Sequence, residues 1–197
     1  MRQLKSYQFF IEIFSEHYTL MRKNKTIIIF FTLLLLMLLT TQIKRMENKQ
    51  QKVLAFAGKY SDRPVIVVSK KDHLLYYCEK GKIVANDQWQ GFTYSFPVKV
   101  SLAGKYYRTP EGEMMIDRKN ANSRYTLFLG LSLPGAYGIH GASTHLASYL
   151  NLMEKADPNF YFVTRRDDTR GCVAVENRVI KYLFAKVGLN TPVLIIP

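Results

Sequence analysis

The strongest pattern of hydrophobic and polar positions is a long apolar run near the N-terminus. No charged residue occurs between Thr26 and Ile43, and Ile27 to Leu39 is apolar apart from Thr32. As an α-helix this run would be about 27 Å long, close to a hydrocarbon thickness of about 30 Å. It predicts a transmembrane or signal-anchor segment over residues 26–43, or the apolar part of an export signal. Residues 40–45 contain no small-x-small cleavage pattern, which favours an uncleaved anchor.

Polar segments flank this run on both sides. Residues 1–25 are a long lead for an export signal, and Met21 with the cationic residues after it resembles an ordinary start. Residues 1–20 are therefore either a mis-assigned start or an amphipathic cytoplasmic segment. Residues 44–62 are polar and rich in lysine, which predicts a linker or stalk. We expect the N-terminus inside the cell and the C-terminal part outside the membrane, although basic residues on both sides specify topology weakly.

From residue 63 onward the pattern changes to short β-branched and aromatic runs separated by turn residues. Residues 64–68, 74–78 and 83–85 form a predicted meander, with charged or glycine-containing turns between them. Further strands are predicted at residues 96–102, 114–117, 125–131, 137–139 and 193–196.

Helical periodicity appears in two places near the C-terminus. Residues 179–187 carry apolar side chains on one helical face, with Asn177 as a candidate N-cap and Gly188 as the stop. A weaker helical stretch covers residues 143–154. The segment between Gly141 and Cys172 is predicted to be either a lid over a groove or a helix packed on the sheet. Residues 63–197 therefore predict a mainly β (α+β) domain with one or two packed helices.

The net charge of the chain is +13, which suggests an anionic partner such as nucleic acid, a membrane surface or an anionic polymer. Nucleic acid is disfavoured by the export segment and by the lack of a basic-aromatic RNA-binding motif. For an exported protein, a cell-wall polymer or anionic lipid is the more natural partner.

The candidate chemistry lies in two glycine-flanked motifs, His140-Gly141 and Thr169-Arg170-Gly171-Cys172. A cysteine attacks as the thiolate, which needs a base or a cationic neighbour, and His140 and Arg170 are candidates for these roles. Backbone N–H groups near Gly171 and Cys172 are candidates for an oxyanion hole. The pattern therefore favours a cysteine acyl-transfer enzyme. The structural alternatives are a buried cysteine and a histidine bonded to a backbone carbonyl.

Two further readings of the cysteines and histidines are less well supported. A zinc site of His140, His145 and Cys172 lacks the usual ligand spacing and a clear further ligand, so no metal is expected. A disulfide between Cys78 and Cys172 would consume the proposed nucleophile, and we expect Cys78 to be a packed apolar residue instead.

These motifs resemble, in order, those of the L,D-transpeptidase (YkuD-type) catalytic domain of bacterial cell-wall enzymes. The matching pieces are Gly81 in a hairpin, Thr109-Pro110-x-Gly112, Ile139-His140-Gly141 and Thr169-x-Gly171-Cys172-Val173. The resemblance covers residues 63–197 and implies a β-sandwich of short strands. Many members have arginine where this chain has Ala174 and histidine where it has Arg170. Residues 168–177 instead look like the YafK-type subgroup, which includes enzymes that hydrolyse a crosslink.

The resemblance also implies a mechanism on peptidoglycan stem peptides. Cys172 would be the nucleophile, His140 the base and the Gly141 carbonyl a group that orients the imidazole, with Thr169 and Arg170 as candidate substrate-binding residues. The reaction would be L,D-transpeptidation through a thioester, with no cofactor. The alternatives are hydrolysis of crosslinks and a catalytically silent, membrane-tethered wall-binding module. The implied location is the bacterial membrane, with the catalytic domain in the periplasm or outside the cell.

Overall fold

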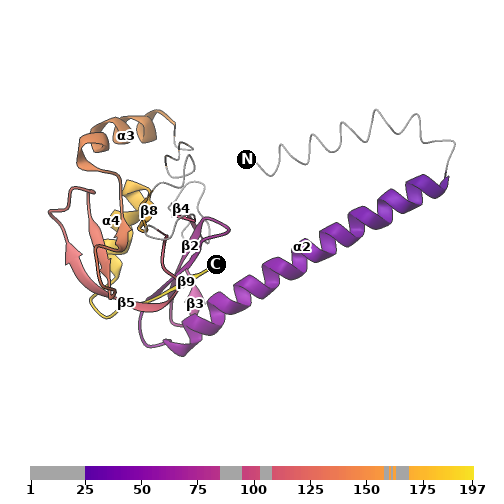
Figure 1. Ribbon diagram of the computed structural model, residues 1–197, viewed down its shortest axis with the longest axis horizontal. Helices are drawn as coiled ribbons and strands as arrows, with labels where there is room; N and C mark the ends of the chain where they lie inside the picture. The colour runs from indigo at the N-terminus through magenta and orange to yellow at the C-terminus, as the bar shows by residue number, and fades with distance from the viewer. Residues whose placement is uncertain (1–24, 85–94, 103–107, 158–159, 161, 163–168) are drawn as a thin grey trace. The chain divides into compact units, whose positions relative to one another are not determined.

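The computed structural model describes residues 25–84, 95–102, 108–157, 160, 162 and 169–197. The chain divides into two units, with the boundary between residues 50 and 51. Helix α2 (Lys25–Lys59) begins in the first unit (Figure 1). Its segment Ile27–Lys44 is long and apolar enough to cross a membrane, has a mean hydropathy of 2.2 and is 0% buried. Signal sequences near an N-terminus have the same properties. The expected apolar helix is therefore present, and residues 1–24 of the predicted lead lie outside the described residues.

The segment predicted as a linker, residues 44–62, is helical up to Lys59, and its second half belongs to the folded unit. Val53, Phe56 and Ala57 are buried at the helical spacing that places them on one face. They form a cluster with buried residues of the first two strands, namely Val65, Val67 and Cys78. Only the first half of this segment remains a candidate stalk. The apolar spacing of 53, 56 and 57 was the sequence signal for this packing.

Nine short strands form the sheet of the described C-terminal unit. They are β1 (Val65–Ser69), β2 (Leu74–Glu79), β3 (Lys82–Ile83), β4 (Phe96–Lys99), β5 (Gly112–Asn120), β6 (Phe128–Leu131), β7 (Gly138–His140), β8 (Val173–Val175) and β9 (Pro192–Ile196). Most of these strands were predicted from the sequence pattern. The three-residue strand β8 was not, because so short a run carries no periodicity.

The order of the strands is β1-β9-β5-β6-β7-β8-β4-β2-β3, and β1 also pairs with β2. This additional pairing closes eight strands into a ring, with β3 attached outside it to β2. The expected β-sandwich is therefore wrong in this respect, because the sheet is barrel-like. The antiparallel β1–β2 register, Val65 opposite Cys78 to Ser69 opposite Leu74, removes the free edges that a sandwich would leave.

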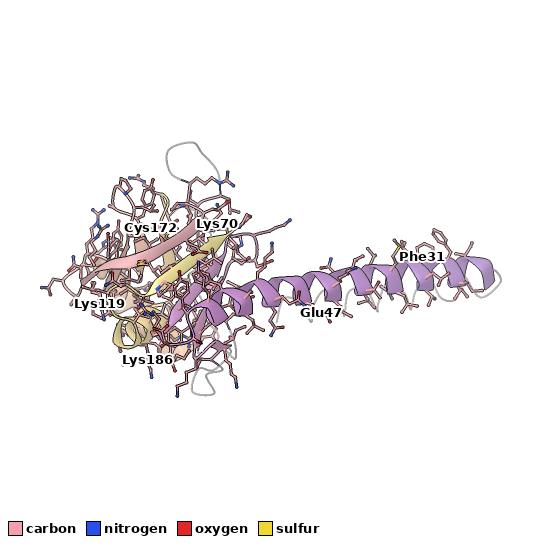
Figure 2. The ribbon with its side chains drawn as sticks, turned by 90° about the horizontal axis from the view of Figure 1, so that it is seen from below. Phe31, Glu47, Lys70, Lys119, Cys172 and Lys186 are labelled. Atoms are coloured by element: carbon pink, nitrogen blue, oxygen red, sulfur yellow. The ribbon has the colours of Figure 1, made fainter. Side chains whose placement is uncertain are left out.

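Two helices accompany the sheet, α3 (Thr144–Ala156) and α4 (Asn177–Lys186), both close to their predicted ranges. Helix α4 buries Val179, Ile180 and Leu183 in the main core. Its C-terminal end is held from β5, because Lys119 Nζ donates to the carbonyl oxygens of Phe184 and Val187 at 2.6 and 2.7 Å. Figure 2 labels Lys119 on β5 and Lys186, the last residue of α4.

The predicted N-cap role of Asn177 is wrong. The residue before the helix is Glu176, and Asn177 is itself the first helical residue. Its side chain is buried, and its Oδ1 bonds to another segment of the chain, as described below, so this oxygen serves tertiary partners instead of the helix end.

Candidate active site

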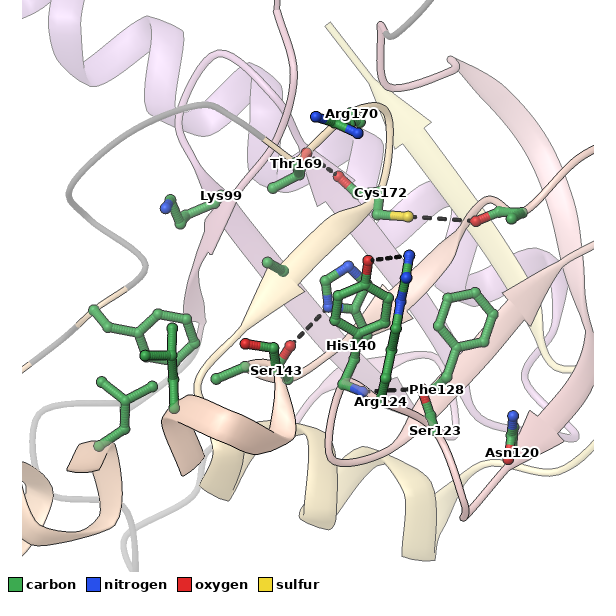
Figure 3. A pocket seen from close by; sticks show the side chains of 18 of the residues that line it. Lys99, Asn120, Ser123, Arg124, Phe128, His140, Ser143, Thr169, Arg170 and Cys172 are labelled. Carbon is green, nitrogen blue, oxygen red and sulfur yellow. Dashed lines mark hydrogen bonds between the residues drawn. The ribbon is translucent and has the colours of Figure 1, made fainter. Parts of the chain in front are cut away.

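The pairing of β7 with β8 brings the two predicted motifs together. These strands are parallel neighbours, with Ile139 opposite Val173 and His140 opposite Ala174. His140 ends β7, and Cys172 immediately precedes Val173, the partner of Ile139, so the two residues lie only two register positions apart along the pair. Both also line one cleft of about 1000 Å³ (Figure 3). Residues 32 positions apart in the chain thus share one site because two short strands are adjacent.

The thiol of Cys172 is partly buried and protonated at rest. Its Sγ donates a hydrogen bond to the backbone carbonyl of Ala136 at 3.4 Å. Burial raises the pKa of the thiol above its ordinary value, while a backbone hydrogen bond from Gly138 and the charge of Arg124 act in the opposite direction. The sequence suggested Arg170 as the cation that favours the thiolate. In the structure the charge that lowers the pKa of this thiol is that of Arg124, which the sequence did not single out.

The imidazole of His140 is fixed in place and kept neutral. Its Nδ1 lies 2.7 Å from the carbonyl oxygen of Gly141, the contact that was expected from the sequence. The carbonyl can only accept, so Nδ1 carries the proton and Nε2 is left as the basic nitrogen. The ring stacks on Tyr125 at a centroid distance of 4.2 Å and an interplanar angle of 23°. Burial lowers the pKa of His140, so its imidazole stays neutral down to a lower pH than that of an ordinary histidine.

The loop before the nucleophile has an unusual backbone. Arg170 and Gly171 have φ angles of +51° and +100°. A Cβ on Gly171 would lie 2.6 Å from the ring of Tyr137, so only glycine fits both the conformation and the space. The loop presents Cys172 to the cleft, and Arg170 is exposed at its edge.

Thr169 closes this loop and also lines the cleft. Its hydroxyl donates to the carbonyl oxygen of Cys172 at 2.6 Å, and Cys172 N–H donates to the carbonyl oxygen of Thr169 at 3.3 Å. The Thr169 hydroxyl is therefore engaged within the loop. To donate to an oxyanion, the Cys172 N–H would have to break this long hydrogen bond to Thr169.

An ion pair between the buried Lys70 and the partly exposed Glu111 supports the loop of the nucleophile, and it was not predicted from the sequence. Lys70 is 1% exposed, and its Nζ lies 2.6 Å from Glu111 Oε1 and 2.9 Å from the carbonyl oxygen of Thr109. The hydroxyl of Thr109 accepts a bond from Ser101 N–H at 2.8 Å and donates to the carbonyl oxygen of Cys172 at 3.3 Å. In the sequence, Lys70 lies in a charged turn between two predicted strands, and nothing local marks a lysine that folds inward.

Asn177 fixes the segment that follows His140. Its Oδ1 accepts hydrogen bonds from Ala142 N–H at 2.8 Å and from the Thr126 hydroxyl at 3.4 Å. A Cβ on Gly141 would lie 2.7 Å from this oxygen, so Gly141 allows the close approach. The first residue of α4 therefore holds the end of β7 in position.

The cleft has a basic and polar wall and an apolar wall. Leu146, Tyr149 and Leu150 of α3 line it, and Leu150 is buried in a small cluster with Ala142 and Phe160. Helix α3 therefore packs beside the cleft, and parts of the predicted lid, residues 158–159, 161 and 163–168, lie outside the described residues. The polar lining residues are Lys99, Asn120, Asn122, Ser123, Arg124, Ser143, Thr169 and Arg170.

The zinc and disulfide alternatives gain no support. Within the described ranges, no group of three or more histidine, cysteine or acidic residues is arranged to hold a metal ion. His145 Nε2 lies 3.3 Å from Ser143 Oγ on the exposed start of α3. Cys78 and Cys172 are both free, and Cys78 is buried against α2 as the sequence predicted.

Comparisons with known proteins agree with the resemblance stated above. Residues 63–195 match the family model described as the L,D-transpeptidase catalytic domain. No curated protein matches. Among solved structures, an L,D-transpeptidase from Mycobacterium tuberculosis is 16% identical with a TM-score of 0.49, covering 68% of this chain and 57% of that one. The L,D-transpeptidase from Xylanimonas cellulosilytica is 17% identical with a TM-score of 0.47, with coverages of 68% and 60%.

The chain therefore spans somewhat under two thirds of these solved proteins. The family match covers more than half of the chain, from just before β1 into β9, and includes both motifs of the cleft. The chain belongs to the family of L,D-transpeptidase catalytic domains.

Proposed function

We propose that this protein is an L,D-transpeptidase that acts on peptidoglycan stem peptides through a thioester on Cys172. The observation that carries the proposal is the β7–β8 pairing, which puts Cys172 and His140 in one cleft. A thiol beside an oriented, neutral imidazole is suited to acyl transfer. The membership of the family supplies the class of substrate.

In the first half-reaction, His140 Nε2 takes the proton of Cys172 Sγ as the sulfur attacks the peptide carbonyl carbon. The tetrahedral intermediate then collapses, the C–N bond breaks, and the imidazolium gives its proton to the leaving amine. The products are a thioester and a free amine. In the second half-reaction, His140 deprotonates the amine of a second stem peptide, which attacks the thioester and restores the thiol.

The environments of the two groups support this division of roles. Burial raises the pKa of Cys172 and lowers that of His140, so the resting pair is a neutral thiol and a neutral imidazole. A neutral imidazole is free to accept the proton when the substrate arrives. The Gly141 carbonyl fixes the ring, and backbone N–H groups at Gly171 and Cys172 are the proposed oxyanion donors.

Two residues of the loop before Cys172, Thr169 and Arg170, have proposed roles beside the reacting pair. Arg170 borders the cleft and is proposed to contact an anionic group of the substrate. Thr169 contributes through the loop that it closes, because its hydroxyl already bonds to Cys172. From residues 168–177, including Ala174, we propose membership of the YafK-type subgroup.

The apolar helix gives the proposed location. We infer that residues 26–43 anchor the protein in the bacterial membrane and that the catalytic unit lies on the outer side, where peptidoglycan is found. Within the described part of α2, the large apolar side chains from Ile27 to Leu39 are mostly exposed, as expected of a helix that contacts lipid.

Intact-mass spectrometry of the protein with purified tetrapeptide muropeptides tests the proposal. We expect an acyl adduct that is absent in Cys172→Ala, strongly reduced in His140→Ala and retained in Cys78→Ala, the matched control at the other cysteine. Crosslinked dimers among the products would establish transfer, and trimmed monomers alone would establish hydrolysis. Binding without any adduct would instead favour the wall-binding module and contradict the proposal.

A further inference from the structure

The charged residues that line the cleft are all of one sign. Among the described lining residues, Lys99, Arg124 and Arg170 are basic and none is acidic. A cleft with this lining attracts anionic groups and disfavours cationic ones. If the protein acts as proposed above, one of these cations recognises a negative charge on the acyl donor itself, beside the carbonyl that Cys172 attacks.

Arg124 is the cation whose position is most completely defined. Its Nη2 donates to the Tyr125 hydroxyl at 2.8 Å, and its Cζ lies 4.8 Å from the centroid of the Tyr125 ring. The Tyr125 ring in turn stacks on His140, so the guanidinium is coupled to the proposed base through one aromatic side chain. The Arg124 carbonyl accepts a bond from Thr144 N–H at 2.8 Å, which ties its loop to the start of α3.

The guanidinium extends toward the nucleophile. Figure 3 shows the Arg124 side chain rising from its loop toward Cys172, with its end near the thiol. Its charge also acts on both Cys172 and His140. A substrate carbonyl held at the sulfur therefore has this cation beside it.

Arg124 also has guanidinium N–H donors that the hydrogen bond to Tyr125 does not use. A guanidinium carries five N–H donors, and the bond to Tyr125 uses one of them. Three other arginines of the described ranges, Arg63, Arg108 and Arg118, pair with Asp or Glu, but no described carboxylate pairs with Arg124. A planar guanidinium fork fits a carboxylate through two parallel hydrogen bonds, and peptide substrates carry carboxylates.

We propose that Arg124 binds a free carboxylate on the donor residue that supplies the attacked carbonyl, and so makes the enzyme selective for anionic acyl donors. The inference rests on the proposed function. It adds to that function a specificity-determining residue and the chemical class of the donor. Tyr125 serves as the positioning residue that holds the guanidinium over the site.

Two synthetic donor peptides that differ only in this group, a free carboxylate and its primary amide, test the inference. The full-length protein in detergent micelles is assayed for kcat/KM from release of the donor's C-terminal residue. The wild type should prefer the free acid by about tenfold. A hydrogen bond to a charged group contributes at least about 1.4 kcal/mol, and this energy corresponds to a factor of ten in kcat/KM. Any loss that Arg124→Gln causes through the thiolate is common to both donors, so this variant should lose about tenfold more on the acid than on the amide, and with it the preference.

Arg124→Lys keeps the charge without the fork and should fall between the two. Arg63→Gln, which removes an equal charge at a site outside the cleft, is the matched control and should keep the full preference. An equal loss on both donors would show that Arg124 acts only on the thiolate and would overturn the inference. So would a wild type that turns over both donors equally. No turnover of either donor by the wild type would overturn the proposed function as well.

Discussion

At the scale of single residues, the proposed active site keeps both reacting groups uncharged until a substrate binds. The thiol of Cys172 donates to a backbone carbonyl, and the imidazole of His140 is buried, stacked on Tyr125 and oriented by Gly141. Burial disfavours the charged form of each group. The resting enzyme is therefore not a preformed thiolate–imidazolium pair, and proton transfer accompanies the attack on the carbonyl.

Thiol alkylation as a function of pH tests this description. Because burial raises the pKa of Cys172, its reaction with iodoacetamide should be slow at neutral pH and should rise with a midpoint above that of a free cysteine, about 8.5. Arg124→Gln should move the midpoint higher, since the arginine charge favours the thiolate. Mass spectrometry of tryptic peptides separates the two cysteines.

Cys78 is the internal reference for this titration. It is 0% exposed, and burial raises its pKa to about 12, so it should stay unmodified while Cys172 reacts. A midpoint for Cys172 below that of a free cysteine would indicate a preformed thiolate and contradict the neutral resting pair.

At the scale of elements, the site depends on contacts between segments that are distant in sequence. The Lys70–Glu111 pair joins the end of β1 to the residue before β5, and Thr109 carries the connection to the carbonyl of Cys172. Asn177 at the start of α4 holds Ala142 after β7. Each of the two proposed reacting residues is thus supported by an element other than its own strand.

Substitutions in the Lys70–Glu111 pair should have unequal effects on stability. Glu111→Gln leaves the buried ammonium without its carboxylate, which should lower the free energy of unfolding by about 3 kcal/mol. Lys70→Met fills the same space and leaves a partly exposed carboxylate that water can reach, so the loss should be smaller, roughly 1–2 kcal/mol. Urea denaturation of both variants gives these values, and the reverse order would contradict the assignment.

The same pair predicts a dependence on pH. Its hydrogen bond with Lys70 lowers the pKa of Glu111 in the folded state. The stabilisation is therefore complete above the unfolded-state pKa of about 4.3 and disappears as the pH falls through the lower folded value. The difference in stability between the wild type and Glu111→Gln should accordingly shrink in acid, which denaturation at several pH values measures.

At the scale of the whole molecule, the folded unit begins before the segment that matches the family. The family match starts at residue 63, whereas the compact unit starts at residue 51. The last turns of α2 cover the β1–β2 side of the barrel with Val53, Phe56 and Ala57. The end of this long helix is therefore part of the catalytic unit's core.

Fragments that begin at residues 51 and 63 should differ in stability. Removing residues 51–62 takes away the burial of one Val and one Phe side chain, worth about 3–6 kcal/mol together. Phe56→Ala in the longer fragment should cost about 3–5 kcal/mol. Leu54→Ala is the matched control, because Leu54 is exposed, and it should change little. Equal unfolding free energies for the two fragments would show that α2 adds nothing to the unit.

The sequence by itself determined the features that depend on local pattern and on residue type. The hydrophobic pattern predicts three of these features: the apolar run from Ile27, the strand-rich character after residue 63, and the helix with apolar positions 179, 180 and 183. The two glycine-flanked motifs marked Cys172 and His140 as candidates, because few residue types support nucleophilic chemistry. These signals are local, so no tertiary information was needed to detect them.

Only the tertiary structure decided which residues support and surround that pair. Closure of the sheet through β1–β2, burial of Lys70 and the position of Arg124 depend on contacts between residues far apart in the chain. The sequence around a lysine or an arginine does not show whether its side chain faces water or binds a partner inside the fold. Their environments, and the charge that acts on Cys172, exist only once the barrel has closed and its strands are in register.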